Sequence, residues 1–336
     1  MPASPRFWKR RGTTAAFLFP LSLIFAVLAA LRRLAYRVGM LRAHRLPVPV
    51  IVVGNIAVGG SGKTPVVLWL VERLIGAGRH PLIISRGYGG RQAGPFAVAP
   101  DTDPAESGDE PVLLARRAGC PVWIGRDRVA VARAALTAHP ECDVIVTDDG
   151  LQHYRLCRDI EIAVVDPEVL GNRLLLPSGP LREPLSRLAR CALVLAHGEL
   201  PAGLRARCGA APVHSMSLAP GALYRLSEPL CRRPAGELAA LRLRAIAGIG
   251  RPERFFATLR ALGLAPASCK AFPDHHAFGP ADVALEDADA LVVTEKDAVK
   301  LQSFAPEQCW VLPVDACIGQ GAFDTILERL DGCQTA

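Results

Sequence analysis

A glycine-rich segment that ends in Lys and Thr is the part of the sequence best suited to chemistry. It consists of Ala57, Val58, Gly59, Gly60, Ser61, Gly62, Lys63 and Thr64. In a loop of this kind, backbone N–H groups surround phosphate oxygens at the start of a helix, where the helix dipole favours anions. Lys63 would reach the β- and γ-phosphates of a nucleotide, and the Thr64 hydroxyl would ligate Mg²⁺. The segment therefore predicts a phosphate-binding loop (P-loop).

The segments on either side of this loop have the patterns that a P-loop needs. Residues 48–53 are rich in β-branched side chains, as in a buried parallel strand. Residues 65–74 have the length and apolar spacing of a helix that begins with Pro65. The usual motif has Gly five residues before Gly62, where this chain has Ala57. A glycine-rich surface turn is the alternative, but strand, loop and helix in this order favour nucleotide binding.

A pair of carboxylates follows another apolar strand. Residues 142–147 precede Asp148 and Asp149, and a Walker B strand ends in this way to deliver a carboxylate to Mg²⁺ or its water ligands. Paired acids at the end of a strand could also simply begin a turn. The P-loop upstream favours the metal-binding interpretation, with Thr64 as a further ligand.

Two other classes of P-loop protein fit less well. A GTPase would have a DxxG motif and an Asn/Thr-Lys-x-Asp motif, and residues 294–297 (Thr-Glu-Lys-Asp) have the right letters in the wrong spacing. A partitioning-type ATPase would need Lys at the position of Val58.

Four other segments concentrate side chains that are useful in catalysis. Residues 85–90 carry Arg86, residues 108–111 carry Asp109 and Glu110, residues 174–184 carry Arg182 and Glu183, and residues 272–276 carry His275. Arginine suits an anionic ligand such as a phosphate, because its planar guanidinium forms two parallel hydrogen bonds. Acids in the first turn of a helix can also be there because the helix dipole favours them. Arg182 and Glu183 could equally pair with each other at the surface.

Charge is distributed unevenly along the 336 residues. The first 45 residues carry nine Lys or Arg and no acid, whereas the remainder carries 30 basic and 32 acidic residues. The basicity therefore belongs to the N-terminal segment, and we expect no nucleic-acid partner. Half of the residues are hydrophobic and 21% are charged, which excludes a disordered protein. The ten cysteines form no CxxC pair and indicate reduced, structural thiols.

The N-terminal segment has the composition of a membrane-associated helix. Between Arg11 and Arg32 lie 20 uncharged residues, about enough for a helix to span a bilayer. The basic flanks suit anionic headgroups. A cleaved signal peptide has a similar composition, but Arg32 and Arg33 directly follow the apolar run. Pro20 and the basic flanks also fit a helix in one leaflet, so the sequence leaves open whether the helix spans the membrane or lies on it.

The alternation of strands and helices indicates an α/β fold of the P-loop NTPase type, with a doubly wound, mostly parallel sheet. We expect a basic membrane-associated helix in residues 1–45, a nucleotide-binding domain in residues 46–215, a smaller α/β domain in residues 216–320, and a C-terminal helix and tail in residues 321–336. The smaller domain would close over the active site.

Taken in order, the motifs resemble those of the tetraacyldisaccharide 4′-kinase family, the lipid A 4′-kinases of Gram-negative bacteria. The matching segments are 58–65 (Val-Gly-Gly-Ser-Gly-Lys-Thr-Pro), 85–90 (Ser-Arg-Gly-Tyr-Gly-Gly), 108–111 (Gly-Asp-Glu-Pro), 148–153 (Asp-Asp-Gly-Leu-Gln-His), 176–184 (Leu-Pro-Ser-Gly-Pro-Leu-Arg-Glu-Pro), 247–256 (Ala-Gly-Ile-Gly-Arg-Pro-Glu-Arg-Phe-Phe), 274–275 (Asp-His) and 294–300 (Thr-Glu-Lys-Asp-Ala-Val-Lys). The resemblance extends from the N-terminal apolar segment to about residue 315, and Ala57 also fits this family's loop.

The resemblance implies an activity and roles for the site residues. It implies ATP- and Mg²⁺-dependent phosphorylation of the 4′-hydroxyl of a tetraacylated glucosamine disaccharide 1-phosphate, giving lipid IVA at the cytoplasmic face of the inner membrane. It further implies that Asp109 is the catalytic base in a dyad with His275, and that Glu110 lies near the metal. Lys63 would neutralise the transferring phosphate. Arg86, Arg182 and Glu183 are candidate substrate contacts, and the oligomeric state is left open.

Two rival functions share the P-loop and the apolar helix. A membrane-associated ATPase switch would hydrolyse ATP without a lipid acceptor, and a non-enzymatic nucleotide-binding regulator would not need Asp109 or His275. Only the resemblance of residues 108–111 and 274–275 argues against both.

Overall fold

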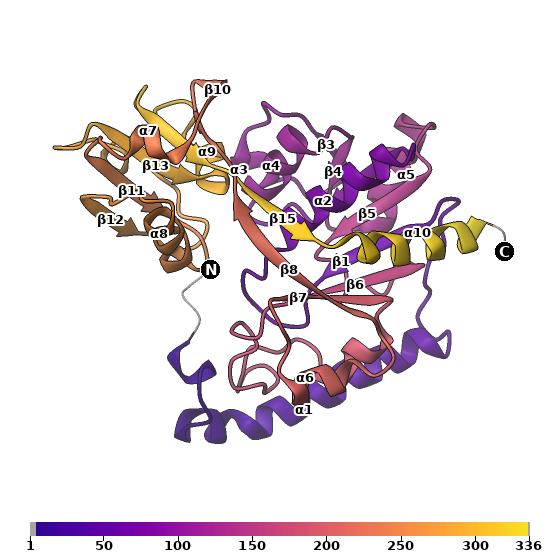
Figure 1. Ribbon diagram of the computed structural model, residues 1–336. Coiled ribbons are helices and arrows are strands. Elements are labelled where there is room, and N and C mark those ends of the chain that lie inside the picture. Colours follow the sequence, from indigo (N-terminus) through magenta and orange to yellow (C-terminus); the bar gives the residue numbers. More distant parts are fainter. Residues whose placement is uncertain (1–4, 335–336) are drawn as a thin grey trace.

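The computed structural model describes residues 5–334, and its β-branched runs form the strands of two sheets (Figure 1). The larger, nine-stranded sheet has the order β15-β8-β7-β6-β1-β5-β2-β4-β3. Its strands are β1 (Val50–Gly54), β2 (Pro81–Ser85), β3 (Phe96–Val98), β4 (Val122–Ile124), β5 (Val144–Asp148), β6 (Ile160–Val165), β7 (Leu193–His197), β8 (Val213–Pro220) and β15 (Val314–Ile318). Only the edge strands β3 and β15 pair in the antiparallel sense. The expected α/β fold with a mostly parallel sheet is confirmed.

Strands β1 and β5 lie side by side in the centre of this sheet, and their register aligns Val53 with Asp148. All residues of both strands are buried, because helices cover both faces of the sheet. Parallel neighbours end at the same sheet edge, where ligands bind in folds of this type. The register therefore brings the P-loop and the paired carboxylates together.

Helices pack on both faces of the larger sheet. One face carries α2 (Lys63–Gly76), α4 (Asp109–Arg117) and α10 (Gln320–Gln334), and the other carries α5 (Arg128–Ala138), η2 (Leu185–Arg190) and α6 (Ala202–Arg205). The C-terminal helix α10 thus belongs to the larger lobe, where Phe323 packs edge-on against Trp69 with ring centroids 6.3 Å apart. Three short helices complete this part of the chain: η1 (Arg6–Trp8), α3 (Pro104–Ser107) and η3 (Ala206–Cys208).

The smaller lobe has its own six-stranded sheet, in the order β10-β9-β14-β13-β11-β12. Its elements are β9 (Leu223–Arg225), β10 (Glu228–Arg233), α7 (Ala235–Leu238), β11 (Leu243–Ala247), α8 (Pro252–Ala261), β12 (Ser268–Ala271), η4 (Pro280–Asp282), β13 (Ala290–Thr294), α9 (Glu295–Leu301) and β14 (Cys309–Leu312). Strands β12, β11, β13 and β14 run parallel.

Two strands of the larger sheet connect the lobes. The chain enters the smaller lobe from β8 and returns through β15, and these strands pair in antiparallel register from Val314–Pro220 to Ile318–Met216 (Figure 1). The domain boundary expected at residue 215 falls inside β8. Pairing between segments about 100 residues apart leaves no local pattern in the sequence.

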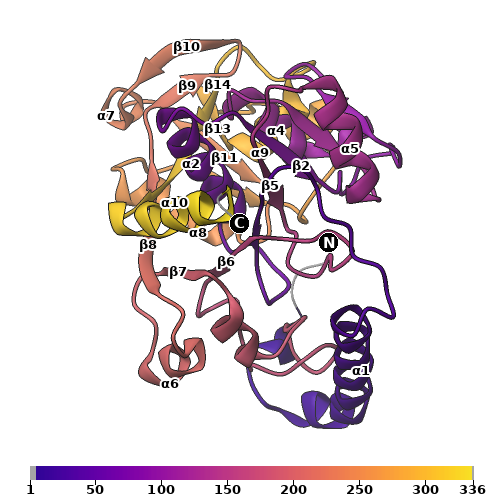
Figure 2. The same ribbon diagram turned by 90° about the vertical axis from the view of Figure 1, so that its right-hand side faces the viewer.

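Helix α1 (Thr13–Arg37) runs along the outside of the larger lobe (Figures 1 and 2). It has 25 residues, a most apolar window of mean hydropathy 2.3, and only 11% of that window is buried. By length and composition it could cross a membrane. Its apolar side chains are exposed, as Phe17 (83%) and Leu28 (61%) illustrate.

Candidate active site

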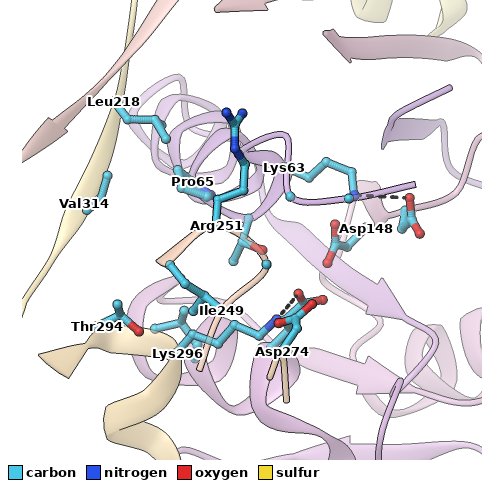
Figure 3. A pocket seen from close by; sticks show the side chains of 18 of the residues that line it. Lys63, Pro65, Asp148, Leu218, Ile249, Arg251, Asp274, Thr294, Lys296 and Val314 are labelled. Atoms are coloured by element: carbon cyan, nitrogen blue, oxygen red, sulfur yellow. Dashed lines mark hydrogen bonds and ion pairs between the residues drawn. The ribbon is translucent and has the colours of Figure 1, made fainter. Parts of the chain in front are cut away.

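A cavity of about 1360 Å³ lies between the two lobes (Figure 3). The P-loop, the end of β5 and the first turn of α4 line it from the larger lobe, and α8, α9 and the loop that contains His275 line it from the smaller lobe. Lys63, Arg86, Glu110, Asp148 and Arg182 all have atoms at its surface, whereas Asp109 does not line it. The cavity therefore brings together most of the charged residues that the sequence singled out.

The end of the P-loop requires glycine. Gly62 has φ +76°, and a Cβ atom there would lie 2.9 Å from Nε2 of His197. The same His197 nitrogen lies 3.0 Å from the Ser61 carbonyl oxygen. Only glycine adopts this conformation readily and leaves room for the imidazole. The loop is thus held against the end of β7 just before helix α2 begins at Lys63.

The start of the P-loop is held by hydrogen bonds within the protein. The N–H of Ala57 donates to Oδ1 of Asn55 (3.1 Å), and the N–H of Val58 donates to the carbonyl oxygen of Pro180 (2.9 Å). These two donors are therefore engaged by the protein itself. The part of the loop that borders the cavity consists of Val58, Gly59, Gly60, Gly62, Lys63 and Thr64, whereas Ser61 is buried.

Asp149 is surrounded by cations. Nζ of Lys63 lies 3.5 Å from its Oδ1, and Nη1 of Arg182 donates to its Oδ2 at 2.9 Å. Burial alone raises the pKa of Asp149, but the charges of Lys63 and Arg182 outweigh it and hold the pKa below its ordinary value. Asp149 also has φ +49°, which is uncommon for a residue other than glycine. Its carboxylate is therefore ionised at neutral pH and fixed beside the P-loop lysine.

Asp148 has a different environment, although it is the next residue. Its side chain is 2% exposed, and its Oδ1 accepts no hydrogen bond from any residue in the described part of the chain. Burial and the negative charge of Glu110 raise the pKa of Asp148. A cation beside Asp148 would offset both its burial and its repulsion by Glu110. The carboxylate oxygens here therefore suit a metal ion.

Residues 5–334 contain no cluster of three or more His, Cys, Asp or Glu side chains arranged as a metal site. Mg²⁺ usually keeps several waters and takes one or two carboxylates together with substrate phosphates. The residues present, Asp148, Asp149, Glu110 and Thr64, therefore fit an ion that arrives with a nucleotide.

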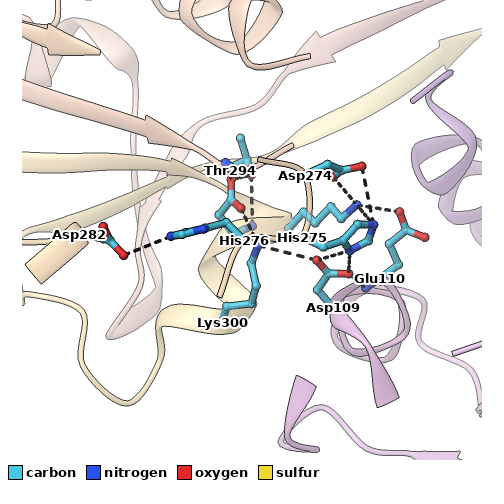
Figure 4. A network of polar contacts seen from close by, with 11 residues as sticks. Asp109, Glu110, Asp274, His275, His276, Asp282, Thr294 and Lys300 are labelled. Atoms are coloured by element: carbon cyan, nitrogen blue, oxygen red, sulfur yellow. Dashed lines mark hydrogen bonds and ion pairs between the residues drawn. The ribbon is translucent and has the colours of Figure 1, made fainter. Parts of the chain in front are cut away.

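Asp109 and His275 meet across the two lobes, although they are 166 residues apart in sequence (Figure 4). Nδ1 of His275 lies 3.0 and 3.1 Å from the two carboxylate oxygens of Asp109, which is 4% exposed. Burial alone raises the pKa of Asp109, but the hydrogen bond with His275 and the charges of Lys296 and Lys300 outweigh it and lower the pKa. The carboxylate is therefore ionised, buried and oriented.

The backbone around this pair is fixed by tight turns. Gly108, which precedes α4, has φ +90°, and a Cβ atom there would lie 2.3 Å from the carbonyl oxygen of Tyr88. The loop at residues 85–90 thus packs directly against the residue before Asp109. His275 itself has φ +61°. These constraints explain why the motifs at residues 85–90 and 108–111 contain glycines close to Asp109.

The structure separates the two candidate substrate residues Arg182 and Glu183. They do not pair with each other: Arg182 turns toward Asp149, whereas Glu183 is 2% exposed and lies outside the cavity lining. Glu183 accepts hydrogen bonds from Gln152 (3.0 Å) and Tyr154 (2.7 Å), and forms an ion pair with Arg187 (3.2 Å). Its oxygens are thus engaged by protein donors.

Three cationic residues at the site were given no role by the sequence. Arg128 is 5% exposed, and its Nη2 donates to the carbonyl oxygens of Asp148 (3.0 Å) and Asp149 (3.1 Å). Lys296 and Lys300 extend from α9 toward the acids of α4. Lys296 and Lys300 lie in residues 294–300, a segment that resembles the family. The sequence does not show which residues a lysine in a helix will contact, so it predicted no role for either.

Comparison with known proteins agrees with this geometry. Residues 14–331 match the model of the family described as tetraacyldisaccharide-1-P 4′-kinase. The chain belongs to this family. It is a kinase with a hydroxyl acceptor, as the sequence motifs predicted, and the expected family and enzyme class are confirmed.

Individual members of the tetraacyldisaccharide-1-P 4′-kinase family are similar over almost the whole chain. A tetraacyldisaccharide 4′-kinase of Azoarcus sp. (strain BH72) is 56% identical, covering 98% of this chain and 96% of the relative. One of Aromatoleum aromaticum is 54% identical over 97% of each chain. Among solved structures, the "apo" form of LpxK from Aquifex aeolicus in complex with ATP superposes with a TM-score of 0.81 at 29% identity, covering 95% of this chain and 100% of that one.

Proposed function

We propose that this kinase transfers the γ-phosphate of ATP, with Mg²⁺, to the 4′-hydroxyl of a tetraacyldisaccharide 1-phosphate, forming lipid IVA in lipid A biosynthesis. The observation that carries the proposal is the buried Asp109–His275 pair between the lobes. His275 and Glu110, the residue after Asp109, line the same cavity as the P-loop. A sugar hydroxyl is a weak nucleophile and needs a base within hydrogen-bond reach. A nucleotide-binding regulator would need no such pair.

The P-loop residues would hold the triphosphate. Residues 59–64, all of which except Ser61 border the cavity, would direct backbone N–H groups and the Lys63 ammonium at the β- and γ-phosphates. Ala57 and Val58 would shape the loop, since their N–H groups already donate within the protein. Lys63 would act as the catalytic cation, because it neutralises charge that develops during transfer.

Thr64, Asp148, Asp149 and Glu110 would hold Mg²⁺. The ion would supply charge neutralisation on the β- and γ-phosphate oxygens when it is bound. The unpaired, buried Oδ1 of Asp148 supports this assignment. Arg182 keeps Asp149 ionised and fixed in orientation.

Asp109 would act as the general base. Its carboxylate accepts the proton of the 4′-hydroxyl as the new O–P bond forms, the bond between the γ-phosphorus and the β–γ bridging oxygen breaks, and ADP leaves with the electron pair of that bond. His275 orients Asp109 through Nδ1.

Arg86 and Arg182 line the cavity between the lobes and would contact anionic groups of the substrate or of ATP. Glu183 would position Gln152 and Tyr154 rather than touch the substrate.

Helix α1 would lie along the cytoplasmic face of the inner membrane rather than span it. The helix and the residues that lead into it contact the larger lobe at three levels: Trp8 Nε1 donates to the carbonyl oxygen of Pro177 (2.9 Å), Ser22 Oγ donates to that of Leu175 (2.9 Å), and the Tyr36 ring lies 6.0 Å from that of Tyr154. A spanning orientation would draw this lobe into hydrocarbon, where buried charges are costly. The exposed apolar side chains would then enter one leaflet.

The test is transfer of labelled γ-phosphate in detergent micelles, with and without the tetraacyldisaccharide 1-phosphate. We expect labelled lipid from the unaltered protein and none from Lys63→Ala. Asp109→Asn should lower kcat by about 10²- to 10⁴-fold, while the matched change Asp324→Asn, at an exposed position of α10, should not. Phosphate release without labelled lipid would contradict the proposed acceptor, and near-normal turnover of folded Asp109→Asn would contradict the proposed base.

A further inference from the structure

Lys296 is a largely buried cation at the centre of the polar contacts between the lobes (Figure 3). It lies in the first turn of α9, and its side chain is 17% exposed. Its Nζ lies 2.9 Å from Oε1 of Glu110, 3.3 Å from Oδ1 of Asp274 and 3.4 Å from Nε2 of His275. One ammonium group thus touches both lobes and the imidazole of the proposed dyad.

The contacts of the His275 ring identify its tautomer. An ammonium group has three donors and no acceptor, and an ionised carboxylate has only acceptors. Asp109 faces Nδ1 and Lys296 faces Nε2. Nδ1 must therefore carry the proton, and Nε2 must present its lone pair to the ammonium.

We propose that Lys296 is a positioning residue of the kinase reaction, which donates to Nε2 of His275 and so fixes the neutral tautomer whose Nδ1–H holds Asp109 in place. This proposal rests on the roles of Asp109 and His275 proposed above. With its Nε2 lone pair engaged, the ring orients the carboxylate, and Asp109 alone accepts the substrate proton.

The surroundings of the ring explain why this tautomer needs a dedicated donor. Oδ2 of Asp274 lies 3.7 Å from Nε2 of His275, so a carboxylate acceptor stands next to the nitrogen that must remain unprotonated. Without Lys296, a proton on Nε2 would be stabilised by Asp274. The ring would then be either an imidazolium between two carboxylates or a neutral ring whose Nδ1 lone pair faces Asp109. The imidazolium would make Asp109 a weaker base, and the neutral form would remove its orienting hydrogen bond.

The second lysine of α9 cannot substitute for Lys296. Nζ of Lys300 lies 2.9 Å from Oδ1 of Asp297 and 3.8 Å from Oδ2 of Asp109, and it stacks over the Phe278 ring at 4.8 Å. It contributes charge near the dyad but contacts Asp109 rather than the ring nitrogens. Only Lys296, of the described lysines, lies within hydrogen-bond distance of Nε2.

The first test is a double-mutant cycle on the lipid kinase activity. Lys296→Met should lower kcat by about 10- to 100-fold with the KM for ATP changed less than about twofold, because orientation of a base contributes to the transition state. In a His275→Ala background the same change should cause no further loss. Lys270→Met, at a residue whose side chain is 53% exposed in the same lobe, is the matched control. An additional loss in the His275→Ala background would overturn the proposal, because Lys296 would then act on the phosphate or the metal.

The second test is direct and begins with the unaltered protein. With ¹⁵N-labelled histidine, the ring signals of His275 in the full chain should show a protonated Nδ1 and an unprotonated Nε2, and Lys296→Met should convert Nε2 to the protonated form. A protonated Nε2 in the unaltered protein would overturn the proposal even if Lys296→Met fails to fold. Full activity of His275→Ala would instead refute the proposed dyad, which separates that failure from a failure of the Lys296 assignment.

Discussion

Nη1 of Arg251 in the smaller lobe lies 3.0 Å from Oδ2 of Asp166 in the larger lobe, and this ion pair joins the lobes beside the cavity. Arg254 reaches the same oxygen at 2.6 Å, and both arginines also contact Glu168. Asp166 is 1% exposed, whereas Glu168 is 66% exposed. We therefore expect the buried Asp166 to contribute more to the free energy of this contact than the exposed Glu168.

Replacing Asp166 should weaken the contact between the lobes. Asp166→Asn leaves two arginines facing a neutral amide, and we expect a loss of about 2 kcal/mol in the free energy of unfolding. The matched change Glu168→Gln should cost less than about 1 kcal/mol, because exposed pairs contribute little. Chemical denaturation of both variants measures the difference. Equal losses would show that burial of Asp166 is not what matters.

Because of its backbone conformation, Gly62 should be needed for the stability of the protein even when no nucleotide is bound. Gly62→Ala places a Cβ atom 2.9 Å from Nε2 of His197 at φ +76°, so we expect a loss of about 1–2 kcal/mol in the free energy of unfolding. Gly60→Ala is the control, since a Cβ atom there meets nothing within 4 Å. Its effect should stay within about 0.5 kcal/mol. A Gly62→Ala protein as stable as Gly60→Ala would refute this account of the loop.

His153 should make the protein less stable in mild acid. Burial, together with the charges of Arg128 and Arg158, lowers the pKa of His153 to about 4, whereas an unfolded chain has about 6.5. Between these values the unfolded state binds a proton that the folded state does not, so the free energy of unfolding falls as the pH drops from about 6.5 to 4.

The loss due to His153 should be on the order of 1 kcal/mol, allowing for its partial exposure. Denaturation of His153→Gln at a series of pH values checks this, because the variant should lack that part of the slope. His80→Gln, at an exposed position, is the control. Parallel pH profiles for the unaltered protein and His153→Gln would contradict the prediction.

The exposed apolar face of α1 should determine membrane binding. Phe17→Glu with Leu28→Glu places two charges at positions 83% and 61% exposed, and we expect at least about a tenfold loss of binding to anionic vesicles. Leu230→Glu, at a residue 97% exposed on the smaller lobe, should bind normally. Vesicle flotation measures both. Unchanged flotation of the α1 variant would mean that another surface carries the attachment.

Local features of the site were predictable because they depend on short segments. The P-loop needs glycines and a lysine between a strand and a helix, and β1, the loop and α2 occur where the pattern of residues 48–74 indicated. The pair Asp148–Asp149 follows an apolar strand for the same reason. Neighbouring strands with parallel order then bring both motifs to one edge.

Contacts between distant segments were beyond the reach of sequence patterns. The different burial of Arg182 and Glu183, which are adjacent in sequence, depends on which donors the fold places around each. The pairing of β8 with β15 decides where the smaller lobe begins. Neither the burial of these two side chains nor this strand pairing leaves a periodic pattern in the sequence. Both depend on residues brought together from separate parts of the chain.

The sequence alone determined which chemical groups the chain supplies: a P-loop, paired acids after an apolar strand, a candidate base in Asp109, and an apolar helix. The tertiary structure alone decided how these groups act together. It placed His275 against Asp109 across the lobes, buried Lys296 against the ring, and laid α1 along the larger lobe. The reason is physical: side-chain type sets local conformation and charge, whereas burial and partners, which set ionisation and orientation, arise only when distant segments pack.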